Sequence, residues 1–367
     1  MIEAKAVYIH IPFCRHICYY CDFCRQVYQE NLASQYLISL QTEIKAVLSD
    51  TARYKSIYIG GGTPSSLSVS QLTYLFETIK PYQQDDIEYT MECNPEDLIA
   101  EKIILFQQYG INRISIGVQS ASERLLQSVN RNHTLKLVQE GVDRLKSFGI
   151  HNISVDLIYG LPMQSMTDWK DTLQKIVQLN IQHISLYSLT IEENSVFGKR
   201  NIQKIEDDLE ADMYEFAIEF LTQKNFKQYE ISNFCKENFT SKHNLTYWRY
   251  DDFIGLGVGA SGKAEHYRYT NTSSLKAYIK DYRNKEYIHL DTSQQMFEYI
   301  MMNLRTINGI SLSHFEENFK CSFLEVFFQE IEVLKEKNLV EVEKEYFRVS
   351  KKGLIVLNDV LLEFLLR

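Results

Sequence analysis

The sequence lacks several features that define common classes of protein. No apolar run in its 367 residues reaches the length of a transmembrane helix, and its first residues show no basic-then-apolar leader. It also lacks a basic stripe, and its net charge of -9 at pH 7 disfavours nucleic acid as a partner. We therefore expect a soluble, cytoplasmic protein that binds no nucleic acid, with a peripheral membrane contact left open.

The cysteines do not form a disulfide framework. Their number, seven, is odd, and Cys93, Cys235 and Cys321 are isolated, which is typical of a reduced compartment. The chain also lacks both Gly-rich nucleotide motifs, the P-loop and G-x-G-x-x-G, as well as internal repeats and low-complexity tracts. Its hydrophobic content of 45% is sufficient for a sizeable folded core.

Three cysteines are grouped near the start of the sequence. Cys14, Cys18 and Cys21 have the spacing C-x3-C-x2-C, unlike the paired C-x2-C of structural zinc sites. Thiolates are soft ligands that suit iron–sulfur clusters, zinc or Cu(I). A four-iron cluster held by three cysteines leaves one iron free for a non-protein ligand. Two alternatives remain open: zinc held by these three residues and Cys24, or ordinary buried thiols.

Short strand-like stretches alternate with helical patterns over the first two thirds of the chain. The expected strands are residues 7–10, 56–60, 88–93, 113–118, 153–159 and 184–189. The expected helices are residues 31–48, 70–79, 98–109, 122–129, 135–148, 169–179 and 207–223. This alternation predicts an α/β fold with a parallel sheet and right-handed crossovers. Because six units are too few for an eight-stranded barrel, we expect a partial, open (β/α)6 barrel, with a doubly wound sheet as the alternative.

The remaining sequence divides into two parts, which gives three regions in all. Residues 1–228 are the predicted barrel, residues 229–285 a cap or rim extension, and residues 286–367 a mostly helical domain. In the last region we expect helices at 294–304, 313–319, 323–337 and 354–366, and a hairpin at 339–349. Helices followed by a β-wing suggest a winged-helix-like domain. Its helix at 313–319 is not basic, which favours a structural role over DNA binding.

Unusual residues fall at the ends of the predicted strands, where parallel α/β folds place functional groups. Gly61 and Gly62 lack side chains that would block a small polar ligand, and Glu92 is suited to pairing with an ammonium group. Further along, Gln119, Arg131 and Asp156 can hydrogen-bond ribose, carboxylate or adenine groups. The alternative for each residue is a structural one, a tight turn or an ordinary ion pair.

Five motifs in a fixed order give a more specific indication. They are Tyr8-x-His10-Ile-Pro-Phe-Cys14, Gly60-Gly-Gly-Thr-Pro-Ser65, Met91-Glu-Cys-Asn-Pro95, Ser115-Ile-Gly-Val-Gln-Ser120 and Asp156-Leu-Ile-Tyr-Gly-Leu-Pro162. Together with the cysteine triplet and the aromatic Tyr20, they resemble the radical S-adenosylmethionine (SAM) superfamily. The similarity covers residues 7 to about 266 and is strongest to the branch that contains oxygen-independent coproporphyrinogen III oxidase.

The resemblance implies roles for particular residues. Cys14, Cys18 and Cys21 would hold a [4Fe–4S] cluster, and SAM would bind the free iron. The positions matching the family's cluster-bound SAM are Tyr8, Gly61, Glu92 and Thr190. The positions matching the oxidase's second SAM are Tyr20, Gly62, Thr63, Gln119, Arg131 and Asp156. Cys24 departs from the family pattern, which usually has a small polar residue there. It is a spare thiol, a fourth ligand or a site of oxidation.

Three features favour HemW-type heme chaperones over the oxidase. Phe23 gives the chaperone pattern C-x-F after Cys21 where the oxidase has C-x-C, and thirteen residues precede Cys14 where the oxidase has a longer segment. The stretch from His243 to Trp248 resembles the chaperone's heme-binding motif H-N-x-x-Y-W.

In that motif His243 can offer an imidazole to iron, and Tyr247 and Trp248 flat faces to a porphyrin. His10 or His266 are further candidate ligands, and a buried histidine among core aromatic residues is the structural alternative. The resemblance implies heme as cargo, acceptor hemoproteins including respiratory enzymes at the membrane, and an electron donor such as flavodoxin or ferredoxin. It leaves open whether the protein is an enzyme, with the oxidase as the alternative function.

Overall fold

The computed structural model describes residues 4–365, and its main element is a curved sheet of twelve strands in the order β14-β13-β12-β11-β1-β4-β5-β6-β7-β8-β10-β9. Six parallel strands form its centre: β1 (Ala6–Ile11), β4 (Ser56–Gly61), β5 (Glu88–Cys93), β6 (Arg113–Gln119), β7 (Asn152–Tyr159) and β8 (His183–Ser188). Each lies within one residue of its predicted bounds. The predicted parallel α/β architecture is therefore confirmed.

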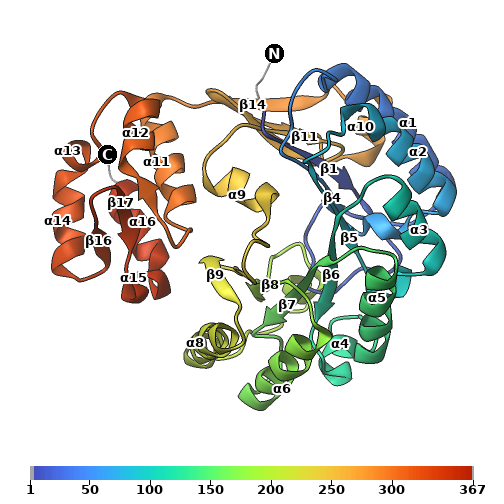
Figure 1. Cartoon of the computed structure of the whole chain (residues 1–367), viewed down its shortest axis with the longest axis horizontal. Helices are drawn as coiled ribbons and strands as arrows, with labels where there is room; N and C mark the ends of the chain where they lie inside the picture. Colours follow the sequence, from blue (N-terminus) through green and yellow to red (C-terminus); the bar gives the residue numbers. More distant parts are fainter. Residues whose placement is uncertain (1–3, 366–367) are drawn as a thin grey trace.

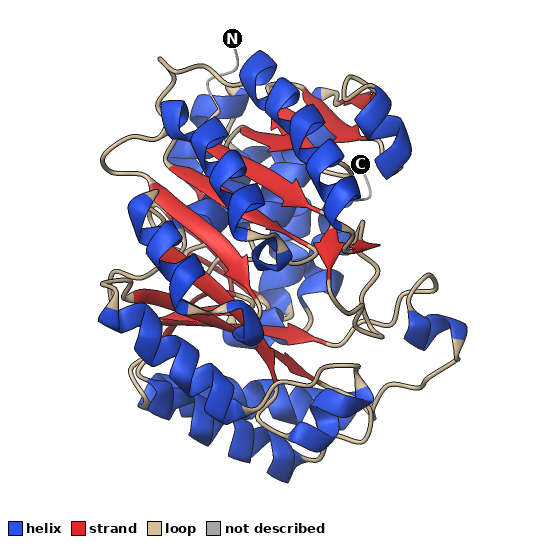
Figure 2. Cartoon of the chain, turned by 90° about the vertical axis from the view of Figure 1, so that its right-hand side faces the viewer, coloured by secondary structure: helices blue, strands red, loops and turns tan. Residues whose placement is uncertain are grey.

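Helices cover the convex face of this sheet (Figures 1 and 2). They are α1 (Glu30–Val47), α2 (Val69–Ile79), α3 (Ala100–Gln108), α4 (Glu123–Ser128), α5 (Leu135–Ser147), α6 (Met166–Ile176) and α8 (Asp207–Gln223). Short helical turns are η1 (Pro64–Ser66), η2 (Lys80–Tyr82), η3 (Pro95–Asp97), η4 (Val177–Leu179) and α7 (Val196–Lys199). Because β1 and β8 pair with further strands and not with each other, the barrel is open. A doubly wound sheet, the alternative fold, would carry helices on both faces, whereas these helices cover the convex face.

Strand alternation separates an apolar outer face from a polar inner one. In β4, Ile57 and Ile59 are fully buried in the main hydrophobic core. Tyr58, between them, points the other way and contacts Glu92 of the neighbouring strand β5. Successive residues of a strand face opposite sides of the sheet, so the residues in step with Tyr58 line the interior of the barrel. The chemistry of this interior is therefore set by every second residue.

Residues 229–285 differ from the prediction of a cap with few regular elements. Most of the short strands that extend the sheet at its two edges lie in this region, together with two short helices. The elements are β9 (Lys227–Glu230), β10 (Asn233–Cys235), α9 (Lys242–Trp248), β11 (Phe253–Leu256), β12 (Ser261–Ala264), β13 (Tyr267–Asn271), α10 (Leu275–Lys280) and β14 (Lys285–His289). The predicted boundaries at 228/229 and 285/286 fall within β9 and β14, and the division into three domains stays a prediction.

The C-terminal part has its own hydrophobic core, built around residues such as Tyr299, Phe315 and Phe347. Its elements are α11 (Thr292–Asn303), β15 (Ile310–Ser311), α12 (Leu312–Phe319), α13 (Phe323–Val326), α14 (Phe328–Glu336), β16 (Val340–Val342), β17 (Tyr346–Val349), α15 (Lys351–Ile355) and α16 (Leu357–Leu365). The helices with a three-stranded sheet agree with the predicted mostly helical, winged part. The predicted helices 323–337 and 354–366 are each broken in two, and residue 366 lies outside the described residues.

One remaining short pair of strands, β2 (Phe13–Cys14) and β3 (Gln26–Val27), holds the two ends of the cysteine loop together. Among residues 4–365, every helix is too short or too polar to span a lipid bilayer.

Candidate functional site

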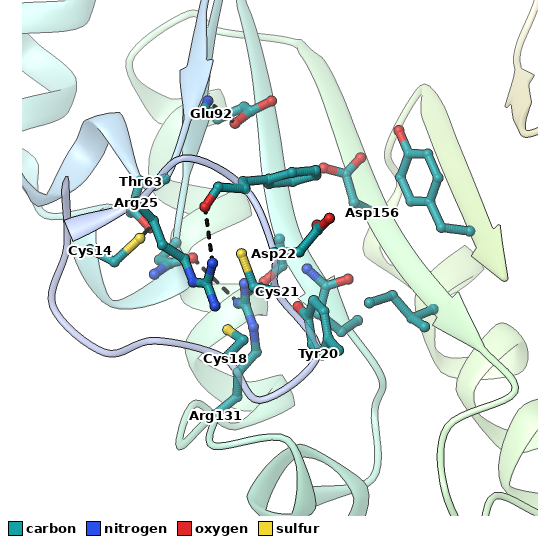
Figure 3. Close-up of a pocket in the computed structure, with 18 of the residues that line it drawn as sticks. Cys14, Cys18, Tyr20, Cys21, Asp22, Arg25, Thr63, Glu92, Arg131 and Asp156 are labelled. Carbon is teal, nitrogen blue, oxygen red and sulfur yellow. Dashed lines mark hydrogen bonds between the residues drawn. The ribbon is translucent and has the colours of Figure 1, made fainter. Parts of the chain in front are cut away.

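A cavity of about 570 Å³ lies at the C-terminal ends of the parallel strands, and we call it the rim cavity. The cysteine loop lines one side of it and the ends of β4 to β8 the other (Figure 3). The predicted residues that line it are Cys14, Cys18, Tyr20, Cys21, Gly61, Gly62, Thr63, Glu92, Gln119, Arg131, Asp156 and Thr190. Tyr8 is not among the lining residues. The structure therefore brings together all the predicted cluster and SAM positions but one.

The three cysteines are unpaired and face this one cavity. Cys14 is the most deeply placed, with 6% of its surface exposed, and burial raises the pKa of its thiol to about 11. The Thr63 hydroxyl donates to Cys14 Sγ at 3.6 Å, and a side chain at Gly62 would come within 2.9 Å of the same sulfur. Thiols on one loop around one cavity suit a cluster that binds a cysteine at each of three corners.

Cys24 does not join this group. Its sulfur donates to the Ser273 carbonyl at 3.4 Å, its side chain lies against Gly259, and it does not line the rim cavity. Within residues 4–365, no three His, Cys, Asp or Glu side chains converge closely enough to hold a single metal ion. A zinc site of four cysteines needs all four sulfurs at about 2.3 Å from one ion, and Cys24 lies outside the cavity that the other three cysteines line.

Glu92 presents a buried carboxylate to the rim cavity from the end of β5. It accepts hydrogen bonds from the Tyr58 hydroxyl at 2.7 Å and from the Gly61 amide at 3.0 Å. Burial raises the pKa of Glu92 to about 7, while the Tyr58 hydrogen bond acts in the opposite direction. Such a carboxylate is suited to a cationic ligand group that restores its charge. Sequence reasoning missed Tyr58; the signal was its inward position between two outward isoleucines.

Opposite Glu92, polar groups from β6, from β7 and from the loop after α4 complete the cavity. The Arg131 guanidinium donates to the Gly117 carbonyl at 2.7 Å and to Asn94 Oδ1 at 3.3 Å, but its buried Nε has no partner among the described residues. Asp156 accepts from the Ser115 hydroxyl at 3.0 Å, and burial raises the pKa of Asp156.

Gln119 lines the same cavity with an unusual backbone. It has φ of +65° at an irregularity in the pairing of β6 with β7. A left-handed residue other than glycine carries strain, and such residues cluster at ligand sites. Unpaired donors, carboxylates and a glycine-lined wall in 570 Å³ fit a polar, charged molecule the size of a nucleoside.

His243 lies at the opposite end of the barrel, near the first residues of β4 and β5. Its Nδ1 shares a hydrogen bond with the Ser56 hydroxyl at 2.9 Å, and its Nε2 with the Tyr247 hydroxyl at 2.7 Å. The ring is 2% exposed and stacks on Tyr58 at 4.8 Å, and burial lowers the pKa of His243 to about 3. The imidazole is therefore neutral, and both of its nitrogens are already engaged.

Tyr247 and Trp248 line a second cavity of about 430 Å³, which we call the α9 cavity. Tyr8 lines this cavity and not the rim cavity, whereas His243 does not line it. The other two candidate histidines lie elsewhere. His10 bonds to the Tyr8 hydroxyl and the Cys24 carbonyl, and the exposed His266 bonds to Gln295. The motif from His243 to Trp248 is thus split between a half-buried aromatic pair that lines a cavity and a buried histidine that does not.

Comparison with known proteins gives a consistent result along the chain. The Radical SAM superfamily pattern matches residues 8–176, and the HemN C-terminal domain pattern matches residues 290–356. A heme chaperone HemW of Lactococcus lactis is 37% identical over 99% of this chain and 98% of its own length. The one from Bacillus subtilis is 36% identical, and the one from Escherichia coli 31%, each over 98% of this chain.

The chain belongs to the HemW family. Among solved structures, coproporphyrinogen III oxidase (HemN) from Escherichia coli has a TM-score of 0.86 and 23% identity, covering 99% of this chain and 90% of that one. The oxidase therefore shares the fold. As a radical SAM protein, the HemW family member described here uses a [4Fe–4S] cluster and SAM, and the rim cavity has the donors that these groups need.

Proposed function

We propose that the protein is a heme chaperone, which binds heme and passes it to acceptor hemoproteins. The observation that carries this proposal is the similarity to HemW chaperones at up to 37% identity over almost the whole of both chains. The chain also carries the C-x-F pattern ending in Phe23 and the motif from His243 to Trp248, on which the resemblance to these chaperones rests. In the motif, Tyr247 and Trp248 offer aromatic faces in a cavity, as a flat porphyrin requires.

The proposal gives the rim residues separate tasks. Cys14, Cys18 and Cys21 hold the cluster, and Glu92 pairs with the ammonium group of SAM. Gly61 and Thr190 line the same SAM, and Tyr8, the remaining position that the resemblance gives, lines the α9 cavity. When bound, the cluster would supply an iron that SAM chelates and an electron that can cleave SAM.

The other rim residues would surround the remainder of the ligand, or a second SAM. These are Tyr20, Gly62, Thr63, Gln119, Arg131 and Asp156. The free Nε of Arg131 supports this assignment, because a buried donor without a partner costs about 1–3 kcal/mol unless a ligand satisfies it.

His243 would act on heme indirectly. Its Nε2 holds the Tyr247 hydroxyl, and its Nδ1 is engaged by Ser56 in the barrel interior. To ligate iron, the His243 imidazole would have to lose one of these two hydrogen bonds and leave its buried position. We therefore assign His243 to holding Tyr247 and Trp248 in place, while those two side chains contact the porphyrin.

We further propose that the acceptors are hemoproteins of the respiratory chain, reached by a peripheral contact with the membrane, and that flavodoxin or ferredoxin reduces the cluster. The test of the function combines a heme titration with transfer to an apo-hemoprotein, using anaerobically reconstituted protein. We expect stoichiometric heme binding, transfer to the acceptor and no consumption of coproporphyrinogen III with SAM and reductant. Porphyrinogen turnover without heme binding would instead identify an oxidase.

A further inference from the structure

The α9 cavity lies where the barrel meets the C-terminal part. Its lining residues come from the strands β1, β11, β12 and β13, from α9 and the residues after it, and from α11 of the C-terminal part. Figure 1 shows α9 between this edge of the sheet and the C-terminal helices. Its surface is largely aromatic, with Tyr8, Tyr247, Trp248, Tyr250 and Phe253 among the lining residues. A volume of about 430 Å³ with aromatic walls is typical of a site for a flat apolar molecule.

One feature of this cavity indicates a ligand and not merely loose packing. The indole Nε1 of Trp248 is buried and has no hydrogen-bond partner among the described residues. An unsatisfied buried donor costs free energy, and such donors are concentrated at sites that bind ligands. The left-handed backbone of Tyr250, with φ of +61°, has a different cause, because Tyr250 follows the end of α9, where the Asp251 amide donates to the Thr246 carbonyl.

Basic side chains at the cavity give it a polar end. Lys263 lies 4.1 Å from the centre of the Tyr250 ring and pairs with Asp252 at 2.6 Å. Arg268 pairs with Glu298 of α11 at 2.9 Å. Asp251 also lines the cavity, but Lys5 pairs with it at 2.5 Å. A carboxylate on a ligand would find two cations there, each already fixed in place.

One methionine lines the same space. Met302 of α11 lines the α9 cavity, whereas its neighbour Met301 packs against the C-terminal core. A thioether is a soft ligand that binds heme iron in electron-transfer proteins, and it needs no deprotonation. None of the nine histidines of the chain is among the residues that line this cavity.

We propose that heme binds in the α9 cavity with Met302 Sδ as an axial ligand of its iron and its propionates directed to Lys263 and Arg268. This inference rests on the proposed function and adds the ligand and the anion-binding residues. The bond formed is a dative one from a sulfur lone pair, so no proton or electron is transferred. Because Met302 belongs to α11, the C-terminal part supplies a heme ligand as well as structural support.

The test compares Met302→Leu with the matched control Met301→Leu, in full-length protein titrated with heme. Leucine keeps the apolar volume and removes the sulfur. We expect Met302→Leu to lose the absorption bands of thioether-ligated heme iron and to bind heme about tenfold more weakly, while Met301→Leu matches the original protein. An unchanged spectrum and affinity in Met302→Leu would overturn the ligand assignment.

A second measurement tests the anion site by titration with heme dimethyl ester, whose propionates carry no charge. We expect the ester to bind several-fold more weakly than heme, with the difference reduced in Lys263→Gln. Equal binding of the ester and the acid would overturn the placement of the propionates. If the unmodified protein binds neither compound, the proposed chaperone function itself fails, and this outcome is distinct from a failure of Met302 alone.

Discussion

Glu92 illustrates how the surroundings of one residue set the chemistry of the rim cavity. The carboxylate is buried, but it keeps two donors, the Tyr58 hydroxyl and the Gly61 amide. Burial favours the protonated form and the two hydrogen bonds favour the ionised form, and the result is a pKa of about 7. A cationic ligand binds the ionised form, so binding and ionisation of Glu92 are linked.

We therefore predict that SAM affinity depends on pH near neutrality. At a pH below about 7, the pKa of Glu92, this carboxyl group is mostly protonated and must lose its proton when SAM binds. The affinity for SAM therefore falls by up to about tenfold for each unit by which the pH is lowered. In Tyr58→Phe the pKa of Glu92 rises further, because the lost hydrogen bond had lowered it, and the midpoint of the pH dependence moves upward. Equilibrium dialysis of SAM between about pH 6 and pH 8 measures both effects.

The control for this prediction is Tyr54→Phe. The Tyr54 hydroxyl accepts from the Ser49 amide at 3.1 Å, and Tyr54 does not line the rim cavity. We expect its pH dependence to match that of the unmodified protein. If the SAM affinity does not change with pH in the original protein or in either variant, Glu92 does not pair with the ammonium group of SAM.

A second prediction concerns the four cysteines of the N-terminal loop. Cys18→Ser removes a thiol that lines the rim cavity, and we expect iron and sulfide after anaerobic reconstitution to fall to a small fraction of the original. Cys24→Ser removes a thiol that bonds to the Ser273 carbonyl outside this cavity, so its iron and sulfide content should stay unchanged. Loss of the cluster in Cys24→Ser would show that the fourth cysteine is a ligand.

The site positions of single residues could be predicted where the residues are close together in the sequence. Cys14, Cys18 and Cys21 lie within eight consecutive positions, so one short loop is sufficient to bring them to the same cavity. Tyr58 and Met302 were missed, because neither belongs to a motif and each functions only through neighbours distant in the sequence. The placement of Tyr8 outside the rim cavity was likewise not visible from its motif.

At the scale of elements, α9 depends on a carboxylate from the sheet. Glu88, the first residue of β5, accepts from the amides of Lys242 at 2.9 Å and His243 at 3.0 Å, and from the Ser241 hydroxyl at 3.3 Å. These groups form the N-terminus of α9, where free amides and the helix dipole favour an anion. One buried side chain therefore fixes the helix that carries Tyr247 and Trp248.

We predict that Glu88→Gln destabilises the protein by about 3 kcal/mol, because charge-assisted hydrogen bonds contribute about 1.5–3 kcal/mol each and one acceptor oxygen is lost. Urea unfolding measures the change. The exposed Glu237 serves as the control, and Glu237→Gln should alter the free energy of unfolding by less than about 0.5 kcal/mol. Equal stabilities of the two variants would mean that Glu88 does not hold α9.

Element prediction worked for the long alternating segments and failed for the short ones. The parallel strands carry β-branched runs between amphipathic helices, and both periodicities are visible in the sequence. The strands between 229 and 285 span three to five residues each, and they hold aromatic and glycine residues in place of a clear alternation. They become strands because they extend an existing sheet, which local sequence does not reveal.

At the scale of the whole molecule, a column of side chains connects the two cavities through the barrel. Tyr58 bonds to Glu92 at the rim cavity and stacks on His243, which in turn bonds to Tyr247 at the α9 cavity. The βα alternation predicted the rim end of this column. The other end depends on β11 pairing beside β1, across about two thirds of the chain, which no local pattern specifies.

The central claim is that cluster and heme occupy separate cavities at opposite ends of one barrel. The most direct measurement is the heme affinity of the triple variant Cys14→Ser, Cys18→Ser and Cys21→Ser, beside the reconstituted original protein. We predict that the variant contains no cluster and still binds heme with a dissociation constant within about twofold of the original, because no cysteine lines the α9 cavity. Loss of heme binding together with the cluster would contradict this account.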